Sequence, residues 1–217
     1  RSIDTASVYG NEDGVGRAIR ESGIPRGDIF LTTKVWNDDQ RGKRTLEAFE
    51  ESLKRLKTEY VDLYLIHWPV KDYYKDTWHV MEKIYQSGRA RAIGVSNFMI
   101  HHLEDLLENS STVPVVNQVE FHPRLLQPHL LKFCREHGIQ VEAWSPLAQG
   151  QVISEPRVKE LAAKNQKSPA QIVLRWDLQH QVVTIPKSIH ADRIAENARI
   201  FDFELSQEDM DALDALD

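Results

Sequence analysis

The chain has 217 residues, 41% of them hydrophobic and 28% charged, which are the proportions of a soluble globular domain able to bury a substantial core. The net charge is −6 and both signs are interspersed, which argues against nucleic acid or an anionic membrane as the main partner. The single cysteine, Cys134, excludes an intramolecular disulfide and favours a cytoplasmic location, and no apolar run approaches the ~20 residues of a membrane helix.

The chain begins with a strand-like run over residues 2–6, where Ile3 alternates with polar neighbours, and the segment stops at Gly10. This pattern predicts that Asp4 lies near the strand's end and Tyr9 in the loop beyond it. The alternative is that Asp4 caps the following helix and Tyr9 is a half-buried aromatic residue.

The rest of the chain alternates apolar runs with helical patterns. Strands are predicted at residues 29–35, 61–67, 90–96, 113–120, 139–144 and 182–186. Helices are predicted at residues 12–22, 45–56, 76–87, 100–108, 128–137 and 156–178, and from about Ala191 and Ser206.

Two details of the helical patterns carry further expectations. Within residues 45–56, one helical face collects Leu46, Phe49, Leu53 and Leu56 and is predicted to be buried. The run over residues 156–178 is broken at Ser168, which reads as an N-cap with Gln171 as its capping-box partner. Cys134 lies inside a helical run and is expected in the core.

Seven strands joined by long helical connections predict parallel pairing through right-handed crossovers. An open doubly wound sheet would carry a G-x-G-x-x-G turn, which is absent, since Gly10, Gly14 and Gly16 have a different spacing. The pattern therefore favours an α/β fold of the (β/α)8 barrel type with seven of eight strands present, as a single domain over residues 1–217. We expect roughly 40 to 50 further residues upstream to supply the first βα unit.

Four residues fall at the ends of three successive predicted strands, namely Asp4, Tyr9, Lys34 and His67. In a barrel these ends converge on one mouth. A buried lysine needs a partner such as Asp4, and a nearby cation favours the phenolate form of a tyrosine, as a proton donor to a carbonyl oxygen requires. The set fits carbonyl reduction, whereas an ion pair that closes the barrel and a structural histidine are the plainer alternatives.

The chain also resembles the aldo-keto reductase family along its whole length. The resemblance rests on Ile3-Asp4-Thr5-Ala6, Tyr9-Gly10-Asn11-Glu12, Thr33-Lys34-Val35-Trp36-Asn37, Val61-Asp62-Leu63-Tyr64 with His67-Trp68-Pro69, Gly94-Val95-Ser96-Asn97-Phe98, Asn117-Gln118-Val119-Glu120, Trp144-Ser145-Pro146-Leu147, and Ile185-Pro186-Lys187-Ser188 with Arg193, Glu196 and Asn197. Each motif is modest alone, but their order makes the resemblance specific. Within the family, the chain is similar to the bacterial branch that reduces glyoxal, methylglyoxal or diketo-gluconate.

This resemblance implies a (β/α)8 barrel that uses NADPH, and it implies roles for individual residues. The catalytic tetrad falls on Asp4, Tyr9, Lys34 and His67. The implied cofactor contacts are Ser96, Asn97, Gln118, Trp144, Ser145, Leu147, Lys187, Ser188, Arg193, Glu196 and Asn197. Trp36 and Trp68 would wall the substrate pocket, and a cytoplasmic monomer acting on a small carbonyl compound without a metal is expected. Members of the family begin with a hairpin, a first barrel strand and a helix and end with a C-terminal tail. We expect these segments, which largely set substrate choice, to lie outside residues 1–217.

The chemistry of several implied contacts is reasonable by itself. Lys187 and Arg193 lie beside a predicted helix N-terminus, which suits a phosphate, although both could be ordinary solvated charges. Ser96 and Asn97 could instead be N-caps of the helix at residue 100. A buried Gln118 needs amide partners, which a carboxamide ligand would supply.

Two other classes of function remain open at this point. One is a non-catalytic NADP(H)-binding barrel that acts as a sensor or structural protein. The other is a metal-dependent barrel hydrolase using Asp4, His67 and His122. No His-x-His pair ends a strand, and a zinc site needs a further well-placed ligand, so we interpret His122 as structural.

Overall fold

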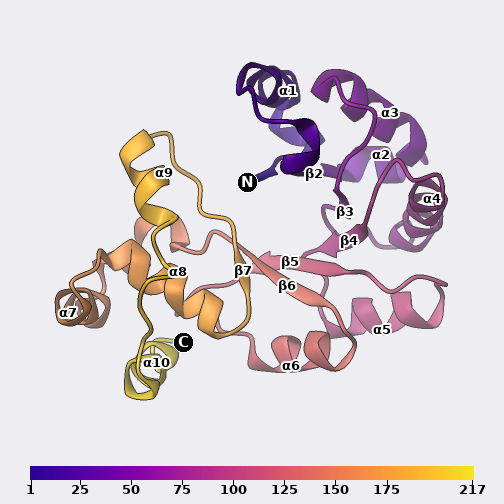
Figure 1. The fold of residues 1–217 in the computed structure, drawn as a ribbon. Helices are drawn as coiled ribbons and strands as arrows, with labels where there is room; N and C mark the ends of the chain where they lie inside the picture. Colours follow the sequence, from indigo (N-terminus) through magenta and orange to yellow (C-terminus); the bar gives the residue numbers. More distant parts are fainter. The chain divides into compact units, whose positions relative to one another are not determined.

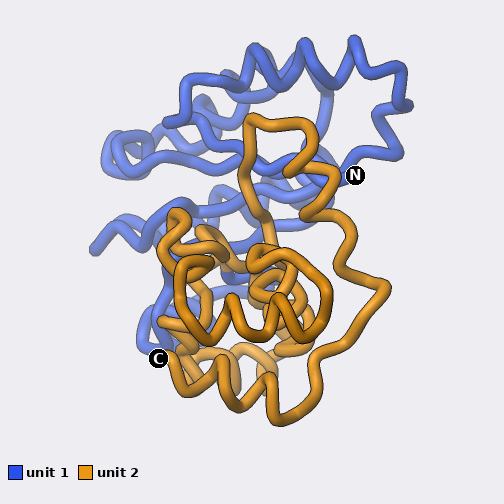
Figure 2. Tube along the Cα trace, turned by 90° about the vertical axis from the view of Figure 1, so that its left-hand side faces the viewer, with its two compact units in different colours: residues 1–117 blue, residues 118–217 orange.

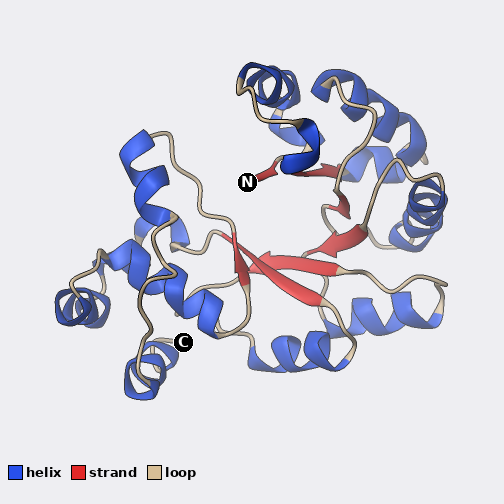
Figure 3. Cartoon of the chain, viewed as in Figure 1, coloured by secondary structure: helices blue, strands red, loops and turns tan.

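The computed structural model describes residues 1–217 and divides into two compact units, unit 1 over residues 1–117 and unit 2 over residues 118–217 (Figure 2). The strands of both units alternate with helices (Figure 3). None of the helices combines the length and apolar character needed to cross a lipid bilayer.

Unit 1 is built on four parallel strands that neighbour one another in sequence order (Figure 1). These are β1 (Ser2–Asp4), β2 (Phe30–Val35), β3 (Leu63–Ile66) and β4 (Ile93–Ser96). Its helices are α1 (Glu12–Glu21), α2 (Asn37–Arg41), α3 (Thr45–Leu56), α4 (Tyr74–Gln86) and α5 (Ile100–Glu108), with 3₁₀ turns η1 (Ser7–Tyr9) and η2 (Arg26–Asp28). Strand β5 (Val116–Glu120) carries the boundary between the units.

Strands β3 and β4 of unit 1 are buried along both faces, as parallel strands covered by helices should be. Leu31, Leu65 and Ile66 are fully buried. Helix α1 approaches α3 so closely at Gly16 that a Cβ atom there would lie 2.3 Å from the carbonyl oxygen of Leu56. Only glycine fits this contact between α1 and α3.

Unit 2 contains the parallel pair β6 (Gln140–Trp144) and β7 (Val183–Thr184). Its helices are α6 (Pro128–Glu136), α7 (Pro156–Asn165), α8 (Pro169–Gln179), α9 (Ala191–Asn197) and α10 (Gln207–Asp214), with 3₁₀ turns η3 (Ala148–Gly150) and η4 (Val152–Ser154). The predicted capping box at Ser168 and Gln171 is confirmed and begins α8. Cys134 is fully buried, as predicted.

All seven predicted strands are present, but several are shorter than their apolar runs. The run over residues 113–120 begins its strand only at Val116, and the run over residues 182–186 forms a strand of two residues. Val113 and Val115 are nearly half exposed in the segment that leads into the strand. β-branched residues favour an extended backbone, but an extended segment forms a strand only where a neighbouring strand makes backbone hydrogen bonds with it.

Two helical expectations need correction. Leu46 is 49% exposed, so its predicted burial was wrong. The buried stripe of α3 instead runs through Thr45, Ala48, Phe49, Ser52, Leu53 and Leu56. This stripe keeps helical spacing with small residues among the large ones, and it leaves Leu46 to one side. Helix α2 was not predicted, because its five polar residues have no apolar periodicity to reveal them.

Candidate active site

Lys34 is fully buried near the end of β2, where its ammonium has defined partners. Its Nζ atom donates to Asp4 Oδ1 at 2.5 Å and to the carbonyl oxygen of Thr5 at 3.0 Å. The parallel pairing of β1 with β2 sets Asp4 opposite Thr32, so the acid and the lysine lie at the same edge of the sheet. A buried ammonium is tolerated only with such compensation.

Tyr9 ends η1 and lies close to this ion pair. Lys34 Nζ is 5.2 Å from the centroid of the Tyr9 ring, and the side chain of Tyr9 is half exposed. The loop is tethered at two points, since Ser7 Oγ donates to the Lys34 carbonyl at 3.1 Å and Thr5 Oγ1 donates to Asn11 Oδ1 at 2.6 Å. The phenol is therefore held beside a cation while remaining open to a ligand.

His67 follows β3 directly and completes the cluster. Its ring makes edge contacts with Tyr9, at a centroid distance of 5.6 Å, and with Trp36, at 5.0 Å. Burial, and secondarily the charge of Lys34, lowers the pKa of His67 to about 4. The imidazole is thus neutral at neutral pH. Its Nδ1 atom is buried without a hydrogen-bond partner.

Unit 1 thus brings together all four residues that the sequence singled out, with Trp36 against them. Trp68 is 42% exposed, and its carbonyl oxygen accepts a hydrogen bond from Gln40 Nε2 at 3.1 Å. The alternative in which Asp4 caps α1 is wrong, because that carboxylate binds Lys34 and the cap position is Asn11.

Ser96 and Asn97 lie at the end of β4. Asn97 has a left-handed backbone with φ of 63°, and its Nδ2 donates to the carbonyl oxygen of His67 at 2.9 Å and to Ser96 Oγ at 3.1 Å. Helix α5 has Met99 as its N-cap, so the interpretation of Ser96 and Asn97 as caps is wrong. Non-glycine residues with positive φ cluster at functional sites, where surrounding contacts stabilise them.

Gln118 on β5 and Trp144 at the end of β6 belong to unit 2. Gln118 is buried and donates through Nε2 to Glu142 Oε1 at 2.5 Å. The protein itself therefore supplies one of the amide partners that the sequence analysis sought in a ligand. Glu142 was missed, although an acid in the middle of a buried strand normally needs a polar partner.

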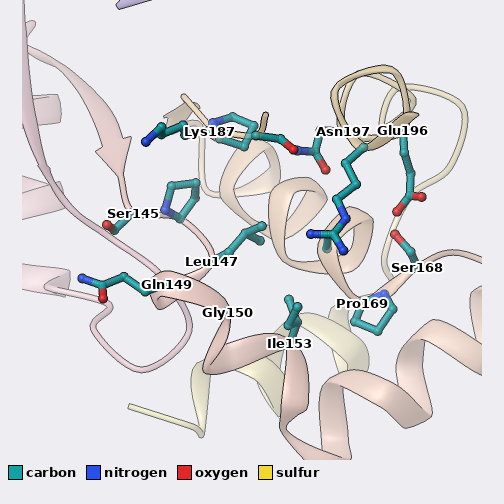
Figure 4. Close-up of a pocket in the computed structure, with 15 residues that line it drawn as sticks. Ser145, Leu147, Gln149, Gly150, Ile153, Ser168, Pro169, Lys187, Glu196 and Asn197 are labelled. Carbon is teal, nitrogen blue, oxygen red and sulfur yellow. The ribbon is translucent and has the colours of Figure 1, made fainter. Parts of the chain in front are cut away.

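A cavity of about 630 Å³ lies within unit 2 (Figure 4). Seven of the predicted cofactor contacts line it, namely Ser145, Leu147, Lys187, Ser188, Arg193, Glu196 and Asn197. They come from the loop after β6, the loop after β7, and α9. Two basic side chains among polar and apolar neighbours make a cavity suited to an anionic ligand with an apolar body.

The cavity has a further wall that the sequence analysis did not assign. It consists of Gln149, Gly150, Ile153, Ser168, Pro169 and Ala170, together with Pro146 and Pro186. Ser168 and Pro169 begin α8, so the capping signature in the sequence could have indicated this wall. Ser145 and Gln149 have left-handed backbones, with φ of 50° and 54°, which no sequence pattern announces.

The residues proposed for a metal-dependent site have other contacts. His122 is buried and its Nδ1 accepts from the backbone nitrogen of Arg124 at 3.2 Å, while its Nε2 lies 3.6 Å from Glu120 Oε1. No group of three or more His, Cys, Asp or Glu side chains gathers in a way that could hold a metal ion.

Comparisons with known proteins agree with the fold and the motifs. The model of the Aldo/keto reductase family matches residues 1–217. The chain is 62% identical over 216 residues to a glyoxal reductase of Bacillus subtilis, covering 100% of this chain and 78% of the relative. A crystal structure of an aldo/keto reductase from Brucella melitensis is 53% identical, with a TM-score of 0.96 over 100% of this chain and 83% of that one.

A further solved structure was determined with a nucleotide bound. It is an aldo-keto reductase of Bombyx mori in complex with NADP, 39% identical, with a TM-score of 0.93 over 100% of this chain and 78% of that one. The likeness over the whole chain confirms the predicted fold class, an α/β fold of the (β/α)8 barrel type. The chain belongs to the aldo/keto reductase family of oxidoreductases.

Proposed function

We propose that this protein reduces small aldehydes and α-ketoaldehydes to alcohols with NADPH, and that Tyr9 donates the proton. The observation that carries the proposal is the buried Lys34, which is bonded to Asp4 and lies 5.2 Å from the ring of Tyr9. A cation held there stabilises the phenolate that remains once the proton has left, because the two opposite charges attract in a partly desolvated site.

His67 has the complementary role of orienting the substrate oxygen. With its pKa lowered to about 4, the ring stays neutral and can present one N–H without bringing a second cation to Lys34. Asp4 keeps the ammonium in place, and Trp36 packs against the edge of the imidazole. Trp36 and the exposed Trp68 are the apolar walls that we propose for a small carbonyl compound.

The cavity of unit 2 fits the adenosine phosphate end of NADP(H). Lys187 and Arg193 supply two cations, and Ser188, Glu196 and Asn197 supply hydrogen-bonding groups, while Leu147 and Ile153 supply apolar surface. We assign the nicotinamide end to Ser96, Asn97, Gln118 and Trp144. When bound, the reduced nicotinamide supplies the hydride. The Bombyx mori relative solved with NADP and the glyoxal reductase of Bacillus subtilis support the cofactor and the substrate class.

Replacement of Tyr9 by phenylalanine tests the proton donor. Tyr9→Phe removes the acidic hydroxyl and leaves the ring, so kcat for glyoxal should fall ~10²–10⁴-fold while the Kd for NADPH changes less than twofold. Steady-state kinetics and fluorescence titration measure the two quantities. Tyr85, 43% exposed on α4, offers the matched control, and Tyr85→Phe should behave as the wild type. Near-parental turnover in Tyr9→Phe would move the role to another residue.

Replacement of Arg193 by alanine tests the choice of NADPH over NADH. A charge-assisted contact contributes ~1.5–3 kcal/mol, so Arg193→Ala should weaken NADPH binding roughly tenfold or more and leave NADH almost unchanged. The control is Arg199→Ala, an exposed arginine two residues beyond α9 that does not line the cavity. Equal losses for both nucleotides would place Arg193 away from the 2′-phosphate.

The same kinetics separate reduction from the sensor alternative. A protein that binds NADPH but turns over no aldehyde would favour a non-catalytic NADP(H)-binding barrel.

We further propose a cytoplasmic monomer, since the lone cysteine is buried and the fold needs no disulfide. Size-exclusion chromatography with light scattering checks the oligomeric state.

A further inference from the structure

Helix α9 carries three residues that line the cavity, yet it has little to hold it in place. Arg193, Glu196 and Asn197 all lie on this helix of seven residues. None of its residues is buried, and Ile194 is 54% exposed. The nearest apolar anchors follow the helix, at Ile200 and Leu205, which are both 4% exposed. Apolar packing of the helix itself therefore cannot fix its cavity-lining side chains.

A row of polar side chains on α8 instead binds the backbone of α9 and of the segment that follows it. Gln171, Arg175 and Gln179 are spaced four residues apart and share one face of the helix. Arg175 Nη1 donates to the carbonyl oxygen of Ile200 at 3.1 Å. Gln179 donates through Nε2 to the carbonyl oxygen of Leu205 at 3.0 Å and accepts from the same residue's backbone nitrogen at 2.7 Å.

Gln171 is the member of this row next to the cavity, and it is 7% exposed. Its Nε2 atom donates to the carbonyl oxygens of Glu196, at 3.3 Å, and Arg199, at 2.9 Å. Its Oε1 atom accepts from the backbone nitrogen of Ser168 at 3.0 Å. One carboxamide thus binds the start of α8 and the end of α9 at the same time.

These two helix ends form facing parts of the cavity. Ser168 and Glu196 both line it, and their side chains point toward one another (Figure 4). Only a carboxamide offers two N–H donors and an acceptor at this length. A carboxylate could still accept from Ser168, but it would face two carbonyl oxygens without a proton to give.

We propose that Gln171 is a positioning residue for the nucleotide, and that it sets the affinity for the adenosine phosphate by holding α9 against the start of α8. The assignment rests on the proposed function, because the occupant of the cavity is taken to be the adenosine end of NADP(H). Gln171 does not line the cavity itself, so it acts through the backbone of Glu196 and Arg199.

The test compares Gln171→Glu and Gln171→Ala with Gln179→Glu, which removes the donor to the Leu205 carbonyl oxygen at the far end of the same row. The probe is 2′,5′-ADP, which carries the adenosine and both phosphates but no nicotinamide. Calorimetry should show at least tenfold weaker binding in both Gln171 variants and less than twofold change in Gln179→Glu. At saturating NADPH, kcat should stay within twofold of the wild type, since the tetrad is untouched.

Hydrogen exchange of the ligand-free protein gives a second readout, which needs no nucleotide. Amides of α9 should exchange faster in the Gln171 variants, and those near Leu205 in Gln179→Glu. Wild-type affinity in folded Gln171 variants, or an equal loss in Gln179→Glu, would overturn the positioning role. Failure of the wild type to bind 2′,5′-ADP is a separate outcome, which would overturn the cofactor site and this assignment together.

Discussion

The burial of Lys34 predicts that the candidate site is sensitive to changes at single residues. Its ammonium is fully enclosed and keeps only two acceptors, the Asp4 carboxylate and the Thr5 carbonyl oxygen. Removing one partner of a buried pair costs ~3–5 kcal/mol, because the other charge is left in a poorly solvated place. Asp4 is therefore expected to contribute to stability as well as to the proposed chemistry, and variants at Asp4 will mix the two effects. Variants at Tyr9, which is half exposed, separate them.

His67 makes the stability of the fold depend on pH in a predictable direction. Its folded pKa of about 4 lies below the ordinary value of 6.5, so the unfolded chain binds a proton first as the pH falls. Stability from this residue is complete above pH 6.5 and is lost between pH 6.5 and 4. Between pH 7 and pH 5 the wild type should lose about 2 kcal/mol more than His67→Gln, whose side chain cannot titrate.

Urea unfolding at the two pH values measures this difference. His129 is exposed on α6, so His129→Gln should follow the wild type at both values and serves as the control. Parallel losses in wild type and His67→Gln would contradict a neutral, desolvated His67.

At the scale of elements, α8 combines two unlike faces. One carries the polar row that binds the segment after α9, and the other is apolar, with Trp176 fully buried and stacked on Phe121 at a centroid distance of 4.8 Å. Trp176 Nε1 also donates to Asp214 of α10 at 2.7 Å. The helix therefore fixes both its apolar neighbours and the backbone that leads to the cavity.

Asp177, on the same helix, is fully buried, and the side chain of Thr184 only partly offsets that burial. Burial raises the pKa of Asp177 well above its usual value. The unfolded chain loses this proton first, so the contribution of Asp177 is present below the unfolded pKa and is lost as the pH rises toward the folded pKa. Asp177→Asn should remove this loss, which is at most ~1.4 kcal/mol per pH unit.

Chemical unfolding at pH 5 and pH 8 tests the prediction. Asp177→Asn should gain stability relative to the wild type at pH 8, and exposed Asp13→Asn should not. A larger loss of stability in Asp177→Asn at pH 8 than at pH 5 would show that the buried carboxyl is ionised.

At the scale of the whole molecule, each unit holds its own part of the proposed chemistry. Unit 1 contains the tetrad around Lys34, and unit 2 contains the cavity lined by Lys187 and Arg193. The proposed reaction needs both parts and no metal ion, whereas a hydrolase would need a metal and no nicotinamide.

A chelator separates these two functions in the purified protein. NADPH absorbance should fall on addition of glyoxal or methylglyoxal, and the rate should be unchanged by EDTA, because in the proposed mechanism Tyr9 donates the proton and no metal ion takes part. A zinc hydrolase assayed in parallel shows that the chelator is effective. Turnover that requires no NADPH and stops with EDTA would overturn the reductase proposal.

The order of strands and helices and the proximity of Asp4, Tyr9, Lys34 and His67 were predictable from the sequence. Parallel strands separated by helices end at one edge, so Asp4, Lys34 and His67 had to meet whatever the details of packing. The motifs were sufficient for the family and for seven of the fifteen residues that line the cavity. The fold and the motifs could be predicted because both depend on local features of the sequence, such as hydrophobic periodicity and turn residues.

Only the tertiary structure decided which pairs of distant side chains satisfy one another. The bond from Gln118 to Glu142 and the bonds from Gln171 to Glu196 and Arg199 join residues more than 20 positions apart. The exposure of Leu46 likewise depends on what α3 packs against. The sequence indicates that a buried polar group needs a hydrogen-bond partner. Which residue is that partner depends on proximity in the folded structure, which local sequence patterns do not encode.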